Sequence, residues 1–435
     1  MATPPPPPPG ELSKRMGTTV KIFLPIAAAL ASRGKINPGD INLSDGENSL
    51  MKTKMVDLCR DAMNQSITED TFANPIGFVG DEPMKEALAQ YFTTYFHPTI
   101  PVTADHIVPT AGSGTALDAL FFTLCDSGDS ILCPVPGWWG YGPYSRFHAE
   151  ANLIPALVKP SSPSWPTDSL SSAIIPALEE AYNSAPDPTR IKAVITSNPN
   201  NPLMKCWPKD VVRQMMDFCQ QRNLHYISDE VFANTVFDPD AEQFVSALSL
   251  LKNPDTEDSD EGKSIIEPSR VHVVWSTTKD FGACGVRSGC VLSYHPLVRA
   301  GVSFASPWQV STLTAHFTSS LLTSPSTPAL LSSVRSQLAT SYKVYRQVLS
   351  APELSGRIEL LSTSAGLWAL ALVTLKADEK VQDIIANGKK KGAIVGAANG
   401  FEAFLQPGQA MIMITIALPD DVLKEGLERF KASLL

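Results

Sequence analysis

Short apolar runs alternate with helix-like patterns along the middle of the chain, and this alternation constrains the fold more than any other feature of the sequence. The apolar runs predict strands at residues 130–134, 193–196, 224–228, 271–275 and 289–293. The patterns between and before them predict helices at residues 84–96, 114–124 and 208–222. Such alternation is typical of an α/β domain with a largely parallel sheet. Ligands of these sheets lie at the carboxyl ends of the strands, so polar residues that directly follow the runs are the first candidates for a functional site.

The length of the chain and its biased segments predict more than one domain. With 435 residues the chain is too long for one simple core, and we expect a large domain and a smaller one. The N-terminal segment MATPPPPPPGELSKR predicts an extended, solvated polyproline tail. Residues 159–168 and 252–264 are poor in apolar residues and predict surface loops. The C-terminal third predicts two helices, at residues 330–349 and 420–434, and two strands, at residues 366–374 and 410–417.

The charge and cysteine patterns disfavour several classes of partner. The net charge is −9 and no run of Lys or Arg stands out, which argues against nucleic acid and anionic membrane surfaces. The seven cysteines are scattered without a C-x-x-C pair, which indicates reduced thiols inside a cell and no metal site. The N-terminus lacks the pattern of a secretory signal, and the apolar stretch 20–31 is too short to span a bilayer. We therefore expect a cytoplasmic protein with no membrane contact.

Four polar segments lie next to predicted strands or helices, and each has an ordinary structural explanation when taken alone. SNPNNP, at residues 197–202, is a typical Asn/Pro turn. A carboxylate of SDE, at residues 228–230, can cap a helix, and the lysine of STTKD, at residues 276–280, can be an ordinary loop lysine. TAGSGTA, at residues 110–116, can hold a phosphate with backbone N–H groups, but a lone glycine-rich stretch is a weak signal.

Taken together and in order, these and further segments resemble a known family. They cover most of residues 41–310 and resemble the fold type I enzymes that depend on pyridoxal 5′-phosphate (PLP). The most similar branch is the 1-aminocyclopropane-1-carboxylate (ACC) synthase-like branch of the class I/II aminotransferases. Chance agreement of this many ordered segments is remote. The segments are INLSDGENSLM (41–51), GFVGDEPMKEAL (77–88), TAGSGTALDALFFTLCDSGD (110–129), PVPGWWGY (134–141), TSNPNNPL (196–203), SDEVFANTVF (228–237) and STTKDFGACGVRSG (276–289).

The resemblance implies roles for the residues that would hold the PLP ring. Lys279 would bind PLP as a Schiff base and later carry the α-proton, which requires a deprotonated amine. Asp229 would pair with the pyridinium nitrogen and keep the ring an electron sink. Asn201 would donate a hydrogen bond to the 3-oxygen of the ring. Trp138 would stack on the ring face, although Trp139 beside it is an alternative.

The resemblance also implies a site for the phosphate of PLP. The backbone of Ser113 and Gly114, the hydroxyl of Ser276 and the guanidinium of Arg287 would hold it. Arg287 follows Lys279 by eight residues, as in the family pattern, and a guanidinium fork suits a phosphate. The structural alternative for Arg287 is an ordinary surface charge.

Two aromatic residues depart from the family pattern, and one acid follows it. Phe232 stands where the family usually has a tyrosine near the 3-oxygen, so one hydrogen bond is lost. Phe78 or Val79 stands where a tyrosine of the neighbouring subunit normally reaches the site. Glu47, followed by Asn48, resembles the glutamate that lies near the substrate's sulfonium in ACC synthases, although a simple loop acid explains it equally well. We expect Glu47, Phe78 and Phe232 on the substrate side.

The arginine that holds the substrate's α-carboxylate in the family has no counterpart in residues 407–419 of this chain. Met411 or Met413 stands at the expected place. A thioether cannot replace the two parallel hydrogen bonds of a guanidinium. Either another group binds the carboxylate, or the substrate has no free carboxylate at this point.

The resemblance finally implies the domains and the activity. Residues 1–75 would form a disordered Pro-rich tail and an N-terminal arm, residues 76–309 the large PLP domain, and residues 310–435 a smaller α+β domain. Relatives build their sites at a dimer interface, so we expect a homodimer. The expected activity is that of an aminotransferase-type enzyme for an amino-acid-like or amine substrate in specialised metabolism. A carbon–sulfur lyase or another β- or γ-elimination enzyme is the alternative, followed by an ACC synthase and last by a non-catalytic descendant.

Overall fold

The computed structural model describes residues 12–32, 36–73, 78, 80–158, 167–252, 265–398, 400–401 and 403–435. The proline run, Val79 and most of the two predicted surface loops lie outside these residues. Thr167–Leu170, at the end of the first loop, is a short 3-10 helix. No helix in the described part of the chain is long and apolar enough to cross a membrane.

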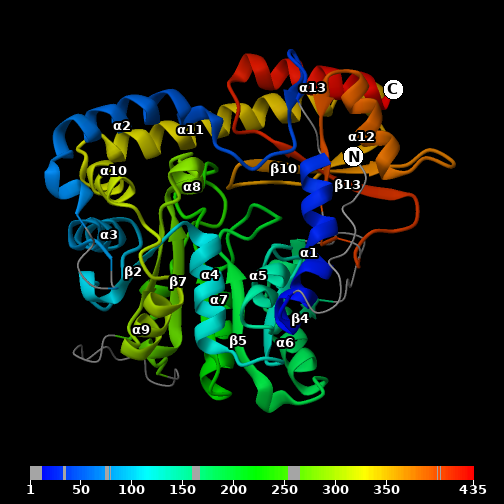
Figure 1. Ribbon diagram of the computed structural model, residues 1–435. Helices are drawn as coiled ribbons and strands as arrows, with labels where there is room; N and C mark the ends of the chain where they lie inside the picture. Colours follow the sequence, from blue (N-terminus) through cyan, green and yellow to red (C-terminus); the bar gives the residue numbers. More distant parts are fainter. Residues whose placement is uncertain are drawn as a thin grey trace.

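A mostly parallel sheet of seven strands forms the centre of the molecule (Figure 1). Its strands are β2 (Ile107–Thr110), β3 (Ser130–Val135), β4 (Asn152–Leu157), β5 (Ile191–Ser197), β6 (His225–Asp229), β7 (Val271–Ser276) and β8 (Gly289–Ser293). They are arranged in the order β2-β8-β7-β6-β5-β3-β4. β8 runs antiparallel to both of its neighbours, and the other pairs are parallel. The five strands predicted from the sequence are β3, β5, β6, β7 and β8, so the expected α/β fold is confirmed.

Helices cover both faces of this sheet, which explains why its strands are apolar almost throughout. The helices on one face are α4 (Ser113–Leu124), α5 (Tyr141–Phe147) and α9 (Pro296–Ala305). The helices on the other face are α3 (Glu82–Tyr95), α6 (Ile174–Asn183) and α7 (Lys209–Gln221). Successive residues of a strand point to opposite faces, so the neighbours Ile131 and Leu132 of β3 enter different cores.

The helix α7 illustrates why the sequence folds locally as it does. Its buried residues recur every three or four positions and form one apolar face, which packs on the sheet. They are Val211, Val212, Met215, Met216, Phe218 and Cys219. The observed helix is one residue shorter at each end than the predicted range 208–222.

A smaller antiparallel sheet with its own helices lies above the central sheet in Figure 1. Its strands, in the order β12-β13-β10-β9, are β12 (Gly396–Ala397), β13 (Gln409–Thr415), β10 (Trp368–Thr374) and β9 (Ile358–Leu360). Its helices are α11 (Thr327–Leu349), α12 (Val381–Lys390) and α13 (Asp420–Leu434). The four elements predicted for the C-terminal third appear as α11, α13, β10 and β13.

The N-terminal segment joins this smaller part of the structure. β1 (Ile41–Asn42) pairs in parallel with β11 (Ala393–Ile394), so segments far apart in the sequence lie side by side.

α1 (Lys14–Ser32) packs on α5 through the rings of Phe23 and Phe147, whose centroids are 4.5 Å apart. α2 (Lys52–Ser66) and α10 (Thr312–Thr323) pack against each other. Division of the chain at residues 76 and 310 stays a prediction.

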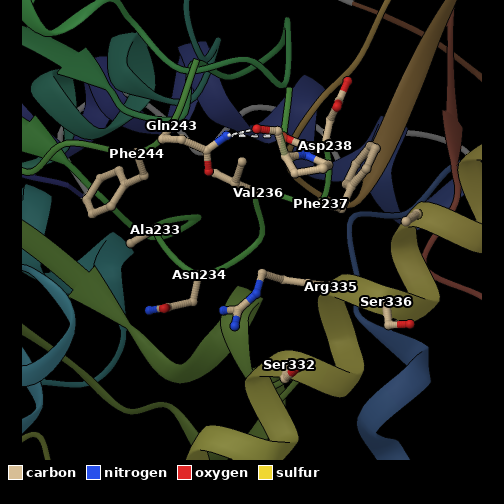
Figure 2. Close-up of a pocket in the computed structure, with 12 residues that line it drawn as sticks. Ala233, Asn234, Val236, Phe237, Asp238, Gln243, Phe244, Ser332, Arg335 and Ser336 are labelled. Atoms are coloured by element: carbon tan, nitrogen blue, oxygen red, sulfur yellow. Dashed lines mark hydrogen bonds between the residues drawn. The ribbon is translucent and has the colours of Figure 1, made fainter. Parts of the chain in front are cut away.

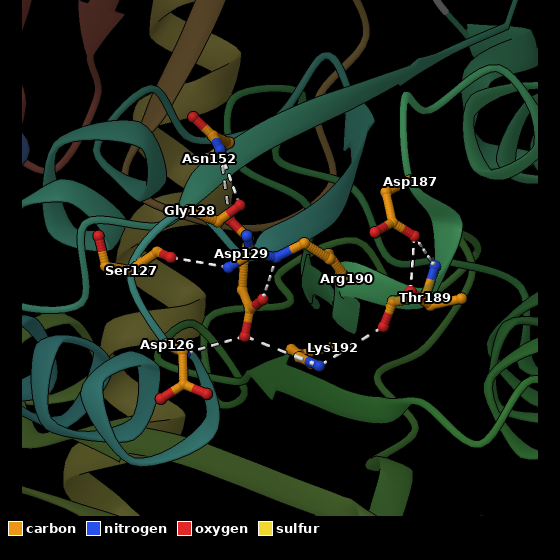
Figure 3. A network of polar contacts seen from close by, with 9 residues as sticks. All are labelled: Asp126, Ser127, Gly128, Asp129, Asn152, Asp187, Thr189, Arg190 and Lys192. Carbon is orange, nitrogen blue, oxygen red and sulfur yellow. Dashed lines mark hydrogen bonds and ion pairs between the residues drawn. The ribbon is translucent and has the colours of Figure 1, made fainter.

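A buried carboxylate ties together the starts of three strands in the central sheet (Figure 3). Asp129 directly precedes β3 and is 2% exposed. Its Oδ1 accepts a hydrogen bond from Arg190 Nε, just before β5, at 2.9 Å, and its backbone oxygen accepts one from Asn152, the first residue of β4, at 2.7 Å. Burial alone would raise the pKa of Asp129, but the N–H of Asp126 and the charges of Arg190 and Lys192 hold it below its ordinary value. The carboxylate therefore stabilises the fold at neutral pH.

Replacing Asp129 with Asn should lower the free energy of unfolding by about 2 kcal/mol at pH 7, because it removes a buried charge whose hydrogen-bond donors remain. Urea unfolding measures this. The difference should shrink as the pH falls through the lowered pKa of Asp129, where the wild-type carboxylate also becomes neutral. Asp126→Asn, at the exposed neighbouring acid, is the control and should change stability by less than about 0.5 kcal/mol. Equal effects of the two variants would contradict a structural role for the Asp129 charge.

Candidate active site

Three adjacent strands of the central sheet end next to one another and carry predicted site residues. Asp229 is the last residue of β6, and the strand register places it beside Ser197 at the end of β5. Ser276 is the last residue of β7, which is the other neighbour of β6. The single helical turn α8 (Thr277–Asp280) begins directly after it and carries Lys279. Parallel packing therefore brings these residues to one edge of the sheet, where ligands of such folds bind.

Lys279 is partly buried in surroundings that favour its neutral amine. Its Nζ donates a hydrogen bond to the backbone oxygen of Gly46 at 2.9 Å. The rings of Phe232 and Trp368 flank Nζ, with centroids 5.7 and 5.9 Å away. Burial lowers the pKa of Lys279, and the acidic groups around it, such as Asp229, oppose this effect without cancelling it. A lower pKa increases the fraction of free amine, which is the nucleophilic form.

One carboxylate oxygen of Asp229 accepts a hydrogen bond, and the other does not. Its Oδ2 accepts a hydrogen bond from the Tyr141 hydroxyl at 3.0 Å. Its Oδ1 is buried and has no hydrogen-bond partner among the described residues. Burial raises the pKa of Asp229 to about 6, although the Tyr141 hydrogen bond acts in the opposite direction. A buried acceptor is normally paired, so this oxygen is a suitable partner for a donor such as the ring N–H of PLP.

Glycines at the start of α4 leave room for two polar side chains. Gly112 precedes the helix with a φ of 87°, which L side chains rarely adopt. A Cβ on Gly112 would lie 2.5 Å from Arg287 Nη2, and a Cβ on Gly114 would lie 2.5 Å from the Tyr144 hydroxyl oxygen. The guanidinium and the hydroxyl therefore approach the unpaired N–H groups of the helix start, an arrangement that binds anions.

Arg287 and Ser276 complete this region. Arg287 donates from Nη1 to the backbone oxygen of Cys284 at 3.1 Å and from Nη2 to that of Ala111 at 3.0 Å. These bonds hold the guanidinium and leave further N–H groups for a ligand, since arginine has five. The Ser276 hydroxyl is buried and has no hydrogen-bond partner among the described residues. A phosphate oxygen would supply that partner, so the residues here fit the phosphate of PLP.

Asn201 and Trp138 lie beside this edge of the sheet. The backbone N–H of Asn201 donates to the Ser197 hydroxyl at 2.8 Å, and its side chain forms no hydrogen bond with another described residue. The Trp138 ring stands edge-on to Tyr141, with centroids 5.2 Å apart and an interplanar angle of 89°. Trp139 is 46% exposed. Because Tyr141 holds Asp229, the packing favours Trp138 over Trp139 as the ring next to the cofactor.

Phe232, Met411 and Met413, predicted to lie on the substrate side, pack in apolar surroundings. Phe232 is 1% exposed, and its ring stands edge-on to Trp368 at 5.3 Å. In the β10–β13 pair, Met413 lies opposite Leu370, two residues from Trp368. Opposed residues of an antiparallel pair share a face of the sheet, so Met413 lies on the face that carries Trp368 beside Lys279. Met411 lies opposite Leu372, two pairs farther from Trp368, and the register therefore favours Met413 as the residue in place of the arginine.

The loop after β1 borders Lys279 with acidic residues. Asn48 is buried and donates from Nδ2 to the backbone oxygen of Lys279 at 3.1 Å. Glu47 forms an ion pair with Lys52 at 2.7 Å and is partly exposed. Asp45 accepts a hydrogen bond from the N–H of Glu47 at 3.3 Å, and burial raises its pKa. Glu47 therefore lies in the loop that the Asn48 hydrogen bond connects to Lys279, and its role on the substrate side stays a prediction.

Phe78 belongs to an exposed aromatic cluster. Its ring lies 4.7 Å from that of Trp308 and 5.7 Å from that of Phe304. The three side chains are 46%, 60% and 66% exposed, in the order Phe78, Trp308 and Phe304. Among the described residues of its own chain, Phe78 makes its aromatic contacts in this cluster and not with the rings around Lys279.

Several residues at the site are not predicted from the sequence, among them Gly112, Tyr141, Tyr144 and Trp368. Gly112 and Tyr141 lie inside the segments TAGSG and PGWWGY, so their presence was visible but their roles required the fold. Tyr144 and Trp368 lie outside every matched segment. Their contacts with Gly114 and Lys279 join residues that are distant along the chain.

The comparison with protein families decides which family has this fold and site. The model for aminotransferase class I and II matches residues 38–430. The chain belongs to this family. It is a fold type I, PLP-dependent aminotransferase-like enzyme, as the ordered segments predict.

Two curated relatives named as aminotransferases match nearly the whole chain, and one named as an ACC synthase matches a part of it. The protein named "Probable aminotransferase aclI" of Aspergillus oryzae is 33% identical over 434 residues, which are 97% of this chain and 98% of the relative. "Probable aminotransferase sirI" of Leptosphaeria maculans is 30% identical over 403 residues and 91% of each chain. "1-aminocyclopropane-1-carboxylate synthase 7" of Arabidopsis thaliana is 29% identical over 307 residues, 70% of this chain and 64% of the relative.

Solved structures show the same fold. A single mutant of Thermus thermophilus aspartate aminotransferase superimposes with a TM-score of 0.72 over 97% of this chain and 99% of that one, at 19% identity. Thermotoga maritima aspartate aminotransferase gives a TM-score of 0.69 over 97% and 99% of the chains, at 18% identity. The chain therefore has the aminotransferase fold.

Replacing Gly112 with Ala should displace the Arg287 guanidinium and lower the free energy of unfolding by about 1–3 kcal/mol, because the backbone conformation and the space both require glycine. Thermal unfolding measures the loss, and a crystal structure of the variant locates Arg287. Gly285→Ala is the control, since a Cβ there meets nothing within 4 Å. An unchanged Arg287 position and unchanged stability in Gly112→Ala would show that Gly112 is not needed to make room for the Arg287 guanidinium.

Proposed function

We propose that the protein is an aminotransferase that uses PLP to act on an amino-acid-like or amine substrate in specialised metabolism. The observation that carries the proposal is Asp229 Oδ1, a buried acceptor without a described partner at the strand end beside Lys279. Two fungal relatives named as aminotransferases, 33% and 30% identical, support amino transfer as the reaction. The residues expected to hold PLP are all present, whereas several of those expected on the substrate side differ from the family pattern, and this combination supports a specialised substrate.

The proposed site holds PLP at its ring nitrogen, its ring face and its phosphate. Asp229 would accept the hydrogen bond of the ring nitrogen, Asn201 would bind the 3-oxygen, and Trp138 would cover one face. The phosphate would be held by the N–H groups of Ser113 and Gly114, the hydroxyl of Ser276 and the guanidinium of Arg287. When bound, PLP withdraws electrons from the substrate carbon that carries the amine.

Lys279 is the residue that would move the proton at the substrate's α-carbon. Its lowered pKa makes the free amine available, and a lysine tuned by burial is an effective general base. The rings of Phe232 and Trp368 exclude water around Nζ, which strengthens the electrostatic interactions there. Asp229 would hold a positive charge on the ring nitrogen, and the Tyr141 hydroxyl keeps the carboxylate oriented.

A second candidate is β- or γ-elimination, including cleavage of a carbon–sulfur bond. The acidic loop supports it, because both Asp45 and Glu47 act electrostatically on Lys279, and such charges can bind a substrate whose sulfur carries a positive charge. Similarity to a protein named as an ACC synthase supports it as well. Products separate the two candidates: an S-substituted cysteine would release a thiol and ammonia in elimination, whereas transfer would pass the amino group to an oxo-acid acceptor.

The exposed aromatic cluster of Phe78, Phe304 and Trp308 supports a homodimer. Contiguous exposed aromatic side chains commonly mark protein–protein contacts. We propose that a second copy of the chain covers them, with two-fold symmetry as in most homodimers. Light scattering would measure a dimer, and a fully active monomer would contradict this assignment.

Replacing Lys279 with Ala should abolish the visible absorbance that PLP acquires on binding and should abolish activity, because the amine that engages the cofactor is removed. Absorption spectra of purified proteins, reconstituted with PLP, measure the first effect. The exposed Lys54, which contacts Ser333, provides a matched control, and Lys54→Ala should retain both properties. A colourless wild-type protein that takes up no PLP would overturn the proposed function.

Replacing Met413 with Arg should introduce a partner for a substrate carboxylate. The ratio of affinities for phenylalanine over phenethylamine, which lacks the carboxylate, should rise by at least about tenfold, since a charge-assisted hydrogen bond is gained. Spectral titration of the PLP-loaded proteins measures both dissociation constants. Met413→Leu keeps the site apolar and should leave the ratio unchanged. An unchanged ratio in Met413→Arg would show that residue 413 does not face the substrate.

A further inference from the structure

A cavity lies between the loop that follows β6 and the helix α11, and none of its lining residues is one of those assigned to PLP (Figure 2). Its volume is about 510 Å³, within the range of small-molecule sites. The walls are partly apolar, with Val236, Phe237 and Phe244 contributed by the loop. The cavity opens to solvent, so a ligand can enter it without unfolding of the surrounding structure.

The cavity contains an arginine that forms no ion pair with an acid of the described part of the chain. Arg335, in the middle of α11, is partly buried and forms no hydrogen bond or ion pair with another described residue. Figure 2 shows its guanidinium directed into the cavity toward Asn234, with Asp238 on the far side. Asp238 Oδ1 instead accepts the backbone N–H of Asp240 at 3.1 Å. A planar guanidinium with free N–H groups, in a partly desolvated position, matches a carboxylate.

The charge of Arg335 acts on two tyrosine hydroxyls of the neighbouring helix α3, those of Tyr91 and Tyr95. Burial raises the pKa of both Tyr91 and Tyr95, and the positive charge of Arg335 opposes that rise. Both hydroxyls remain neutral near pH 7. The positive charge of Arg335 is therefore not neutralised by these hydroxyls, and Asp238 lies on the far side of the cavity, so an anion beside Arg335 would meet the positive end of the site.

We propose that this cavity is a binding site for a small carboxylate with an apolar, ring-sized body. The carboxylate pairs with Arg335, and Ser332, one helical turn earlier on the same face of α11, can donate a hydroxyl hydrogen bond. The body of the ligand lies against Val236, Phe237 and Phe244, where its apolar surface leaves water. The proposal is independent of the reaction assigned to Lys279.

The cavity is connected to the active site by one residue. Asn234 lines the cavity, and its backbone N–H and Nδ2 donate to the Asp280 carboxylate at 3.1 and 3.2 Å. Asp280 is buried, also accepts from Trp275 Nε1 at 3.1 Å, and directly follows Lys279. A carboxylate beside Asn234 would thus lie against the network that anchors α8, which suits a site that regulates the enzyme.

Isothermal titration of the PLP-loaded wild-type protein with phenylacetate, up to about 10 mM, tests the proposal. We expect saturable binding of one phenylacetate per chain, and at least about tenfold weaker binding of the neutral isostere phenylacetamide. Arg335→Gln should weaken phenylacetate binding by at least about tenfold. Arg346→Gln is the matched control, because Arg346 is an exposed arginine of the same helix that does not line this cavity. It should bind like the wild type.

A second variant keeps the test independent of the arginine. Ala339→Leu fills part of the cavity from α11 without changing any charge, and it should also weaken phenylacetate binding. Circular dichroism and PLP absorbance confirm that each variant is folded and loaded. Equal phenylacetate binding by the wild type and Arg335→Gln, or no saturable binding by the wild type, would overturn the proposal.

Discussion

The buried carboxylate of Asp229 is the group on which the arrangement of the site depends. One of its oxygens is held by the Tyr141 hydroxyl at 3.0 Å, and the other is buried without a described partner. Leaving such an acceptor unpaired costs about 1–3 kcal/mol, so the buried, unpaired Oδ1 indicates a ligand that donates a hydrogen bond to it. Tyr141 also stands edge-on to Trp138, and the same residue therefore positions both the charge and the ring beside it.

Lys279 is held next to this carboxylate by three segments that are far apart along the chain. β7 and α8 carry it, Gly46 accepts its amine hydrogen bond, and Trp368 of the smaller sheet flanks Nζ. Asn48 adds a hydrogen bond to its backbone oxygen. The smaller sheet and the N-terminal segment thus lower the pKa of the lysine by burying it, which links the overall fold directly to the reactivity of one amine.

The part of the fold that could be predicted is the part in which buried strands are continuous apolar runs. β2, with the sequence IVPT, and β4, with NLIPAL, were not predicted, because a proline interrupts each apolar run, whereas the proline of β3 follows its apolar residues near the end of the strand. Both lie at the edges of the sheet, where proline is tolerated. α1 was not predicted because Gly17 and Pro25 interrupt its pattern.

The sequence predicted only those site residues that lie within the ordered segments resembling the family. The order of the segments led to Lys279, Asp229 and Arg287, and their roles as cofactor residues stay predictions. Choosing Met413 over Met411 required the register of β10 and β13. The bond from Tyr141 to Asp229 joins residues 88 positions apart, and no local pattern encodes such a contact.

The most direct test of the central claim is the pH titration of the Asp229 carboxyl group, followed by carbon-13 NMR with and without bound PLP. In the PLP-free protein the group should titrate near the raised pKa of about 6. With PLP bound, a positively charged ring nitrogen at Oδ1 should lower that pKa, so that the carboxylate stays ionised through pH 6. The same titration in both states would show that Asp229 does not hold the ring, and would contradict the account.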